Sequence, residues 1–208
     1  MNKSFRRSII AVIIIIIVTI LGTTFAYFYA IANGNGDNIT GDTFNFKASL
    51  SINTIYQATN LVPLSNSLVN TAISKANNKC IDKNNRDVCS LYRITLSNTG
   101  DSITLHPYIT TTSTTYTTTN LKAQLYDDSF HPVSDVMTVS NDSNGKVYFT
   151  TSEGNLAINL GTSNISYYLV VWISETSSSQ LADQDKTFSG TITFEAENGE
   201  SRSIDFSA

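Results

Sequence analysis

The sequence predicts an all-β protein, a sandwich of two antiparallel sheets with one short helix, preceded by a hydrophobic helix. Three observations support this prediction. The chain after its hydrophobic start is rich in Thr, Ser and Asn and contains few prolines. Many of its short segments alternate apolar with polar residues, as half-buried strands do. Clusters of Asn, Asp, Gly and Ser separate these segments. Two sheets that each carry one apolar face bury those faces by packing against each other.

The N-terminal hydrophobic helix is predicted from Ile9 to Ile31. Lys3, Arg6 and Arg7 precede it, and the chain then contains no charged residue before Asp37. A stretch of about 20 apolar residues is long enough to cross the hydrocarbon core of a bilayer. Positive charge on one flank only places the N-terminus inside the cell and the remaining chain outside.

The same residues also fit a secretory signal, with a basic start, an apolar core and small residues after it. The candidate cleavage site comprises Thr24, Phe25, Ala26 and Tyr27, and the segment Ala30-Ile31-Ala32 also fits by spacing. Both interpretations predict export, and they leave cleavage and retention as alternatives. Residues 1–31 are therefore a signal peptide or membrane anchor, and residues 32–208 an extracellular β-sandwich domain.

The charge of the exported part argues against a nucleic-acid partner. Without residues 1–26 the chain carries 10 basic and 17 acidic residues, a net charge of −7. Such a surface repels phosphate backbones.

The two cysteines, Cys80 and Cys89, are predicted to form a local disulfide. Eight residues separate them, and an exported protein folds in an oxidising compartment. A bridge over so short a loop stabilises the fold by roughly 2–3 kcal/mol. A zinc site would need further thiol or imidazole ligands at suitable spacing, and the chain has only His106 and His131 elsewhere.

The first strand is predicted at Thr43 to Ile52, where every second residue is apolar. The next two strands follow Cys89 and Asp101, and the turn between them, residues 98–101, has the composition of a β-hairpin. Later strands are predicted in the segments LKAQLYDD, KVYFTTS, LAINLG, SYYLVVWISET, KTFSGTITFEAE and SRSIDFS.

Four local features refine this outline. The nearly continuous apolar run from Tyr167 to Ile173 indicates a central strand, with Trp172 in the core. Gly190 marks a bulge. Helical spacing of apolar residues predicts one amphipathic helix from Asn66 to Asn77, which would cap an edge or end of the sandwich. The Thr-rich residues 110–120 fit a glycosylated flexible stalk or an edge strand, and the edge strand is favoured.

No catalytic residue is predicted. The chain contains neither an H-E-x-x-H nor a G-x-S-x-G motif, and both histidines precede prolines in predicted loops. The carboxylate pairs are typical of a polar surface. The clusters at residues 82–87 and 141–145 offer oxygen ligands for calcium but lack the spacing of an EF-hand, so polar turns are favoured. We expect no cofactor. Glycan acceptor triplets begin at Asn38, Asn141 and Asn164.

Three stretches resemble the TasA/camelysin-like exported proteins of Gram-positive bacteria. The junction from Thr24 to Phe28 resembles the one that a dedicated signal peptidase cuts in that family. Gly41, Phe44, Phe46 and Leu50 match the family's first strand. The segments YRITLSNTGD and KTFSGTITFEAE resemble its Asn-x-Gly strand end and final strand. The resemblance implies an extended N-terminal segment followed by a jelly-roll-like sandwich.

The family implies two functions. Some members form extracellular fibres of the biofilm matrix, in which the N-terminal segment of one subunit adds a strand to the next. Others carry a metalloendopeptidase label, for which this sequence offers no ligand set. The disulfide loop instead resembles small anchored or secreted surface proteins. We expect a structural or interaction protein on the outer side of the plasma membrane, anchored there or secreted to the surface or matrix. Self-association through residues 27–40 is one hypothesis, and a monomeric anchored binding module of unknown ligand is the alternative.

Overall fold

The computed structural model describes residues 47–73, 78–116, 119–140, 145–180, 183 and 185–208. These residues belong to one of the chain's two compact units, Asn45–Ala208. The predicted membrane segment from Ile9 to Ile31 and the cleavage candidates Thr24, Phe25, Ala26 and Tyr27 lie outside the described residues. Among the residues that are described, no helix has the length and hydrophobicity needed to span a membrane.

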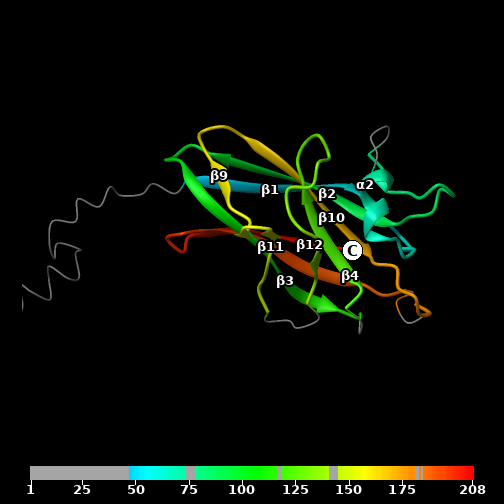
Figure 1. Ribbon diagram of the computed structural model, residues 1–208. Coiled ribbons are helices and arrows are strands. Elements are labelled where there is room, and N and C mark those ends of the chain that lie inside the picture. Colours follow the sequence, from blue (N-terminus) through cyan, green and yellow to red (C-terminus); the bar gives the residue numbers. More distant parts are fainter. Residues whose placement is uncertain (1–46, 74–77, 117–118, 141–144, 181–182, 184) are drawn as a thin grey trace, which may run out of the picture. The chain divides into compact units, whose positions relative to one another are not determined.

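Two antiparallel sheets form the body (Figure 1). The strand order of the first sheet is β1–β2–β10–β4–β5, with bounds Ala48–Tyr56, Cys89–Asn98, Ile165–Ile173, Leu121–Tyr126 and Met137–Thr138. The second sheet has the order β12–β11–β3–β6, and β9 also pairs with β3. Its bounds are Ser201–Ser207, Phe188–Ala196, Ile103–Thr114, Val147–Tyr148 and Ile158–Leu160. Two short strands, Thr150–Thr151 (β7) and Gly154–Asn155 (β8), pair separately.

The main core lies between the two sheets. Its side chains come from the inward-facing positions of the alternating strands. This arrangement confirms the predicted jelly-roll-like sandwich. The largest of its fully buried side chains include Tyr92, Phe149, Phe188, Phe194, Ile94, Leu96, Leu105 and Ile109.

The prediction of a hairpin at residues 98–101 was wrong. β2 pairs with β1 and β10, whereas β3 pairs with β11, β6 and β9, so this turn carries the chain from one sheet to the other. Asn98, which is buried, holds the corner. Its Nδ2 donates to the carbonyl of Asp101 at 2.6 Å and that of Leu160 at 3.4 Å, and its Oδ1 accepts from the amide of Gly100 at 2.9 Å. The same residues would suit a hairpin, but Asn98 bonds to the neighbouring strand β9.

The first strand ends later than its alternation indicates. β1 runs from Ala48 to Tyr56, and residues 43–46 of the predicted strand lie outside the described residues. β1 continues past Ile52 because β2 offers pairing partners as far as Leu91, with a register shift between Thr54 and Tyr56.

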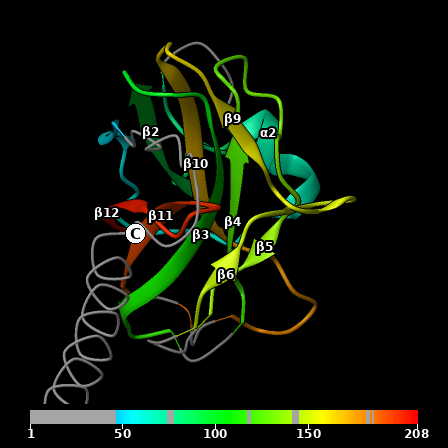
Figure 2. The same ribbon diagram turned by 90° about the vertical axis from the view of Figure 1, so that its left-hand side faces the viewer.

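A second, smaller core covers part of the outer face of the first sheet. β10 is central, as predicted, and Trp172 is fully buried on this outer side. The cover comes from a 3-10 turn, Asn66–Leu68 (η1), and the helix α2, Val69–Ala72. Figure 2 shows α2 beside β4 and β10. The predicted helix is confirmed over this part, and residues 74–77 lie outside the described residues.

The Thr-rich stretch extends β3 as far as Thr114. Leu105, Tyr108 and Ile109 of β3 are paired on both sides, with β11 on one side and β9 or β6 on the other. Residues 110–114 pair with β11 alone among the described strands. The strand interpretation is therefore confirmed for these five threonine and serine positions, at the partly open end of an otherwise interior strand.

Gly190 lies at the predicted bulge, where the register shifts between Ser189 and Gly190 and Thr112 of β3 is the extra residue. A Cβ at this position would lie 2.7 Å from Cζ of Phe188 and 3.1 Å from the carbonyl oxygen of Thr110. We expect Gly190→Ala to lower the free energy of unfolding by about 1–3 kcal/mol, because the buried ring of Phe188 has to move. Urea unfolding with an unchanged m-value measures this loss.

Gly161→Ala is the matched control. No heavy atom would lie within 4 Å of the added Cβ, so its unfolding free energy should change by no more than about 0.5 kcal/mol. Equal losses in both variants would contradict the role given to Phe188.

Candidate functional site

The candidate site is the open side of the sandwich, where the edge strands β1 and β12 face each other. Each of these strands pairs on one side only among the described strands. Hydrogen bonds from Arg202 of β12 to β1 and from Tyr92 of β2 to β12 cross the gap between the sheets. Arg202 of β12 donates from Nε to the carbonyl of Ala48 at 2.8 Å. Tyr92 donates from its hydroxyl to the carbonyl of Ser207. A third bond, from Gln57 Nε2 to Ser207 Oγ, is 3.4 Å long, and among the described strands β1 and β12 form no ladder with each other.

The backbone of β12 presents unpaired groups to this side. Phe188 and Ala208 exchange two hydrogen bonds of 2.8 Å, which makes them a hydrogen-bonded pair of the antiparallel ladder. Such pairs alternate along a ladder, so the intervening residues of β12 direct their N–H and C=O groups outward. These residues are Ser201, Ser203, Asp205 and Ser207, and the carbonyl of Ser201 already accepts from Arg202 at 2.9 Å. The carbonyl of Ser207 is already bonded to Tyr92, so Ser203 and Asp205 are the residues that keep both groups available to a strand.

The edge of β1 has the same property. The carbonyl of Ala48 points away from β2, since it accepts the bond from Arg202. The alternation then directs the N–H and C=O groups of Leu50, Ile52 and Thr54 outward as well. Both edges therefore offer short rows of main-chain donors and acceptors, as an added strand requires.

Two cavities lie along this side. One, of about 410 Å³, is lined by apolar side chains of both sheets, among them Ile52, Tyr92 and Phe206. The other, of about 590 Å³, is lined by residues 57–62 and by the ends of β11 and β12. Ser189 and Ser207 line both cavities, so the two are neighbours. The larger volume lies in the range typical of small-molecule sites.

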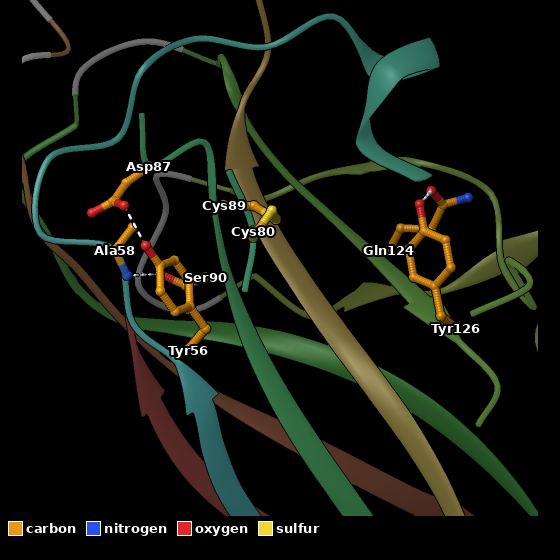
Figure 3. The surroundings of a disulfide bond; sticks show 8 residues. All are labelled: Tyr56, Ala58, Cys80, Asp87, Cys89, Ser90, Gln124 and Tyr126. Carbon is orange, nitrogen blue, oxygen red and sulfur yellow. Dashed lines mark hydrogen bonds between the residues drawn. A yellow bond between two sulfur atoms is a disulfide. The ribbon is translucent and has the colours of Figure 1, made fainter. Parts of the chain in front are cut away.

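A strap, defined as residues 57–63, forms one wall of the larger cavity. Asp87 holds it, as Figure 3 shows in part. The Asp87 carboxylate accepts from the Tyr56 hydroxyl and from the amide and hydroxyl of Thr59, the latter two at 3.2 and 3.3 Å. Its main-chain carbonyl accepts from the amide of Val62 at 2.8 Å. The amide of Ala58 donates to Ser90 Oγ at 3.2 Å.

The contact between Tyr56 and Asp87 shifts the pKa values of both side chains. Hydrogen bonding to the Asp87 carboxylate, helped by burial, raises the pKa of Tyr56 to about 12. Burial raises the pKa of Asp87, but hydrogen bonds from Tyr56 and Thr59 and the charge of Lys79 outweigh it and leave that pKa below its usual value. Asp87 is therefore an ionised acceptor at neutral pH.

The predicted disulfide is confirmed. Cys80 and Cys89 are bonded, their Cα atoms lie 5.3 Å apart, and neither residue has exposed surface. Cys89 is the first residue of β2, two residues after Asp87 (Figure 3). The bridge thus closes a hairpin, residues 80–89, at the base of the segment that holds the strap.

The structure places the two histidines on different elements. His106 lies on β3, so the loop predicted for it was wrong, and its Nδ1 is 3.1 Å from the carbonyl oxygen of Leu156. His131 lies in a turn, with Nδ1 3.4 Å from the Asp127 carboxylate. Within the described ranges, no group of three or more His, Cys, Asp or Glu side chains is arranged to hold a metal ion.

Within the polar turn at residues 82–87, Asp82 bonds to the turn itself, whereas Asp87 bonds to the strap. Asp82 accepts from the amides of Asn84 and Arg86 at 2.8 and 2.9 Å and from Arg86 Nε at 2.8 Å. The hydrogen bond from the Arg86 amide is the main cause that lowers the pKa of Asp82 to about 2. The other cluster, residues 141–145, lies outside the described residues except for Gly145.

Sequence reasoning missed the strap and the residues that hold it. Tyr56 and Asp87 are 31 positions apart, and neither belongs to a recognisable motif. The available signals were indirect: a change from alternating to irregular sequence after Tyr56, and a carboxylate two residues before a cysteine. Neither signal identifies the partner of the other.

Comparisons with known proteins add little to this site. No family model matches the chain, and no curated protein matches it. One similar solved structure is AvmM, which catalyzes macrocyclization in alchivemycin A biosynthesis; it is 8% identical, covers 57% of this chain and 79% of its own, and has a TM-score of 0.28. Another is ACE19, the collagen-binding subdomain of the Enterococcus faecalis surface protein ACE. It is 9% identical, the match covers 59% of this chain and 86% of ACE19, and the TM-score is 0.21. Similarity at these TM-scores carries no argument about function.

Proposed function

We propose that this protein is an exported structural or interaction protein of the cell surface, and that it self-associates by adding its N-terminal segment to the open side of another copy. The observation that carries the proposal is the outward main-chain groups of β1 and β12. Strand addition draws its affinity from such groups and makes modest demands on side chains. Residues 27–40, which precede the body in the chain, are the segment proposed to bind there.

Two further observations support a location outside the cell. A buried disulfide persists in oxidising compartments and is rare in the cytosol. The charged start, the apolar run from Ile9 to Ile31 and the TasA-like junction at Thr24 to Phe28 fit an exported chain that is either cut or retained. Assembly requires release of residues 27–40 from the membrane, so it depends on cleavage near Ala26. The proposal includes no catalytic activity, cofactor or nucleic-acid partner.

A monomeric, membrane-anchored binding module is the second candidate. The cavity of about 590 Å³ beside the strap favours it, because its walls combine apolar groups with hydrogen-bonding ones. This candidate requires the segment from Ile9 to Ile31 to be retained. N-terminal sequencing of the protein isolated from cells separates the two candidates, since assembly requires a new N-terminus and anchoring requires the original one.

Assembly is tested by comparing a chain that begins at Tyr27 with one that begins at Gly41. We expect concentration-dependent filaments by electron microscopy for the longer chain only. Thr54→Pro in the longer chain should weaken assembly, because it removes an outward N–H of β1 without removing a bond to β2. Loss of one hydrogen bond of about 1 kcal/mol lowers an association constant about fivefold. Ser203→Pro makes the same test on β12.

Thr54→Val and Ser203→Ala are the matched controls, since each changes the side chain and keeps the N–H group. They should assemble like the unchanged chain. A chain from Tyr27 that remains monomeric at every concentration, together with an uncut N-terminus in cells, would refute the proposal. If both proline variants assemble normally, the added strand does not bind to these edges.

A further inference from the structure

The strap depends on a short segment of the chain for its position. Between Tyr56 and Leu64, its hydrogen bonds within the described residues run mainly to Asp87 and Ser90. One further bond, from Gln57 Nε2 to Ser207 Oγ, is 3.4 Å long. At its far end the amide of Leu64 donates to the carbonyl of Ile173 at 2.9 Å, which fixes that end to β10 independently.

The two holding residues are themselves anchored differently. Ser90 belongs to β2 and is paired with Val171 of β10, so the first sheet fixes its place. Asp87 lies outside the sheet, in the hairpin of residues 80–89. This hairpin is closed by the Cys80–Cys89 bridge, by the bond from the Val88 amide to the Cys80 carbonyl at 3.1 Å, and by the pairing of Ile81 with Asp87.

We propose that the Cys80–Cys89 disulfide is a redox-operated latch on the strap, such that its reduction frees Asp87 from the strap and opens the wall of the larger cavity. The bridge is the only covalent link that ties residues 80–88 to the start of β2 besides the chain itself. Without it the hairpin is held to its surroundings by weaker contacts, such as the bond from the Ile81 amide to the Ala72 carbonyl at 3.4 Å, and can move away from Tyr56 and Thr59, while Ser90 stays in the sheet. The inference concerns the strap and the cavity and does not rest on assembly.

The chemical step requires an external dithiol. One thiolate of the dithiol attacks a cysteine sulfur and forms a mixed disulfide, and the other cysteine leaves as a thiolate that takes up a proton. The second thiol of the reductant then attacks the mixed disulfide, releases the first cysteine and closes the reductant's own disulfide. Two electrons and two protons pass from the dithiol to the protein. Because both cysteines are buried, the attack follows a local opening of the hairpin.

The movement would change the surface next to the open edge. Residues 57–62 supply one continuous wall of the cavity of about 590 Å³, and the strap follows directly after the last residue of β1. Release of Asp87 removes its acceptors for the hydroxyl of Tyr56 and for the amides of Thr59 and Val62. The end of β1 and the cavity would then become accessible together.

Amide hydrogen exchange by NMR tests the latch on the full chain from Tyr27 to Ala208, with dithiothreitol as the dithiol. On reduction, the amides of Thr59 and Val62 should exchange at least about tenfold faster, as expected for a local opening. The amide of Leu64, bonded to Ile173, and those of β10 and β11 should accelerate only by the factor that the loss of global stability on reduction sets, and should keep a higher opening free energy than Thr59 and Val62. Unchanged rates at Thr59 and Val62 in the fully reduced protein would overturn the proposal, and so would opening free energies at these two amides equal to those of β10 and β11.

The Asp87→Ala variant tests the same hydrogen bonds without reducing the disulfide. With the disulfide intact, this variant should accelerate exchange at Thr59, because the Thr59 amide bonds to the lost carboxylate. Reduction of the variant should then accelerate exchange at that amide by a smaller factor than reduction of the unchanged protein does. Asp82→Ala is the matched control, because the described hydrogen bonds of Asp82 stay within its own hairpin. It should leave Thr59 protected. Equal effects of both substitutions at Thr59 would show a general loosening of the hairpin and overturn the latch.

Discussion

A Trp172→Ala variant is expected to lose about 3–5 kcal/mol of unfolding free energy, the range for removing a large buried aromatic side chain. Trp172 has no exposed surface and lies between Cys89 of β2 and Lys122 of β4 in register. Its ring fills the second core below the covering segment that includes α2. Its Nε1 also donates to Asn66 Oδ1 at 3.1 Å and ties η1 to the sheet. The substitution therefore removes both packing and the bond that holds the cover.

Urea unfolding followed by circular dichroism measures this loss. Trp172→Phe keeps an aromatic ring and removes the N–H donor, so its smaller loss, about 1–3 kcal/mol, separates the bond from the packing. Leu68 lies in the same covering segment, but 52% of its surface is exposed. Leu68→Ala should therefore change the unfolding free energy by no more than about 0.5 kcal/mol. A loss under about 1 kcal/mol for Trp172→Ala would mean that the second core adds little to folding.

The strands were largely predictable because burial on one face imposes an alternation that the sequence displays directly. β2, β10 and β11 each follow from apolar residues at every second position or from a continuous apolar run. Trp172 and the bulge at Gly190 were also recognisable, the first from its place in an apolar run and the second from a glycine within a strand.

Which strands pair was less predictable. The turn at residues 98–101 has hairpin chemistry, yet it connects the two sheets. The deciding contact is between Asn98 and the carbonyl of Leu160, which lies 62 positions further along the chain. Alternation reports on burial and carries no information about the neighbouring strand, so the sheet change had no local signal.

The candidate site was the least predictable part, since it consists of main-chain edges and long-range contacts. Whether the N–H of Thr54 points toward β2 or outward depends on the register between the strands, not on the residue type. The latch joins Tyr56 with Asp87 through a contact that no spacing rule connects. The cysteine pair was the exception, because its short separation and the predicted export were sufficient to identify the disulfide.

Replacing both cysteines with alanine, Cys80→Ala with Cys89→Ala, is expected to lower the unfolding free energy by about 2–4 kcal/mol. The bridge closes a loop with a sequence separation of 9, and in the chain-entropy account a loop of this size constrains the unfolded state by roughly 3 kcal/mol. Two buried sulfur atoms are also lost from the second core. Urea unfolding of the oxidised protein, the reduced protein and the double variant measures the effect. The reduced protein should resemble the double variant, because both lack the covalent link.

The two large effects should not be additive. Trp172 is paired with Cys89 in the ladder and both belong to the second core, so removing one loosens the surroundings of the other. In the combined variant, with Trp172→Ala and both cysteines replaced, we expect a total loss smaller than the sum by about 0.5–3 kcal/mol. Gly190→Ala, in the second sheet, should add its own loss to that of Trp172→Ala without such coupling. Additivity in the combined variant would show that the bridge acts on the unfolded chain alone and that the second core does not depend on it.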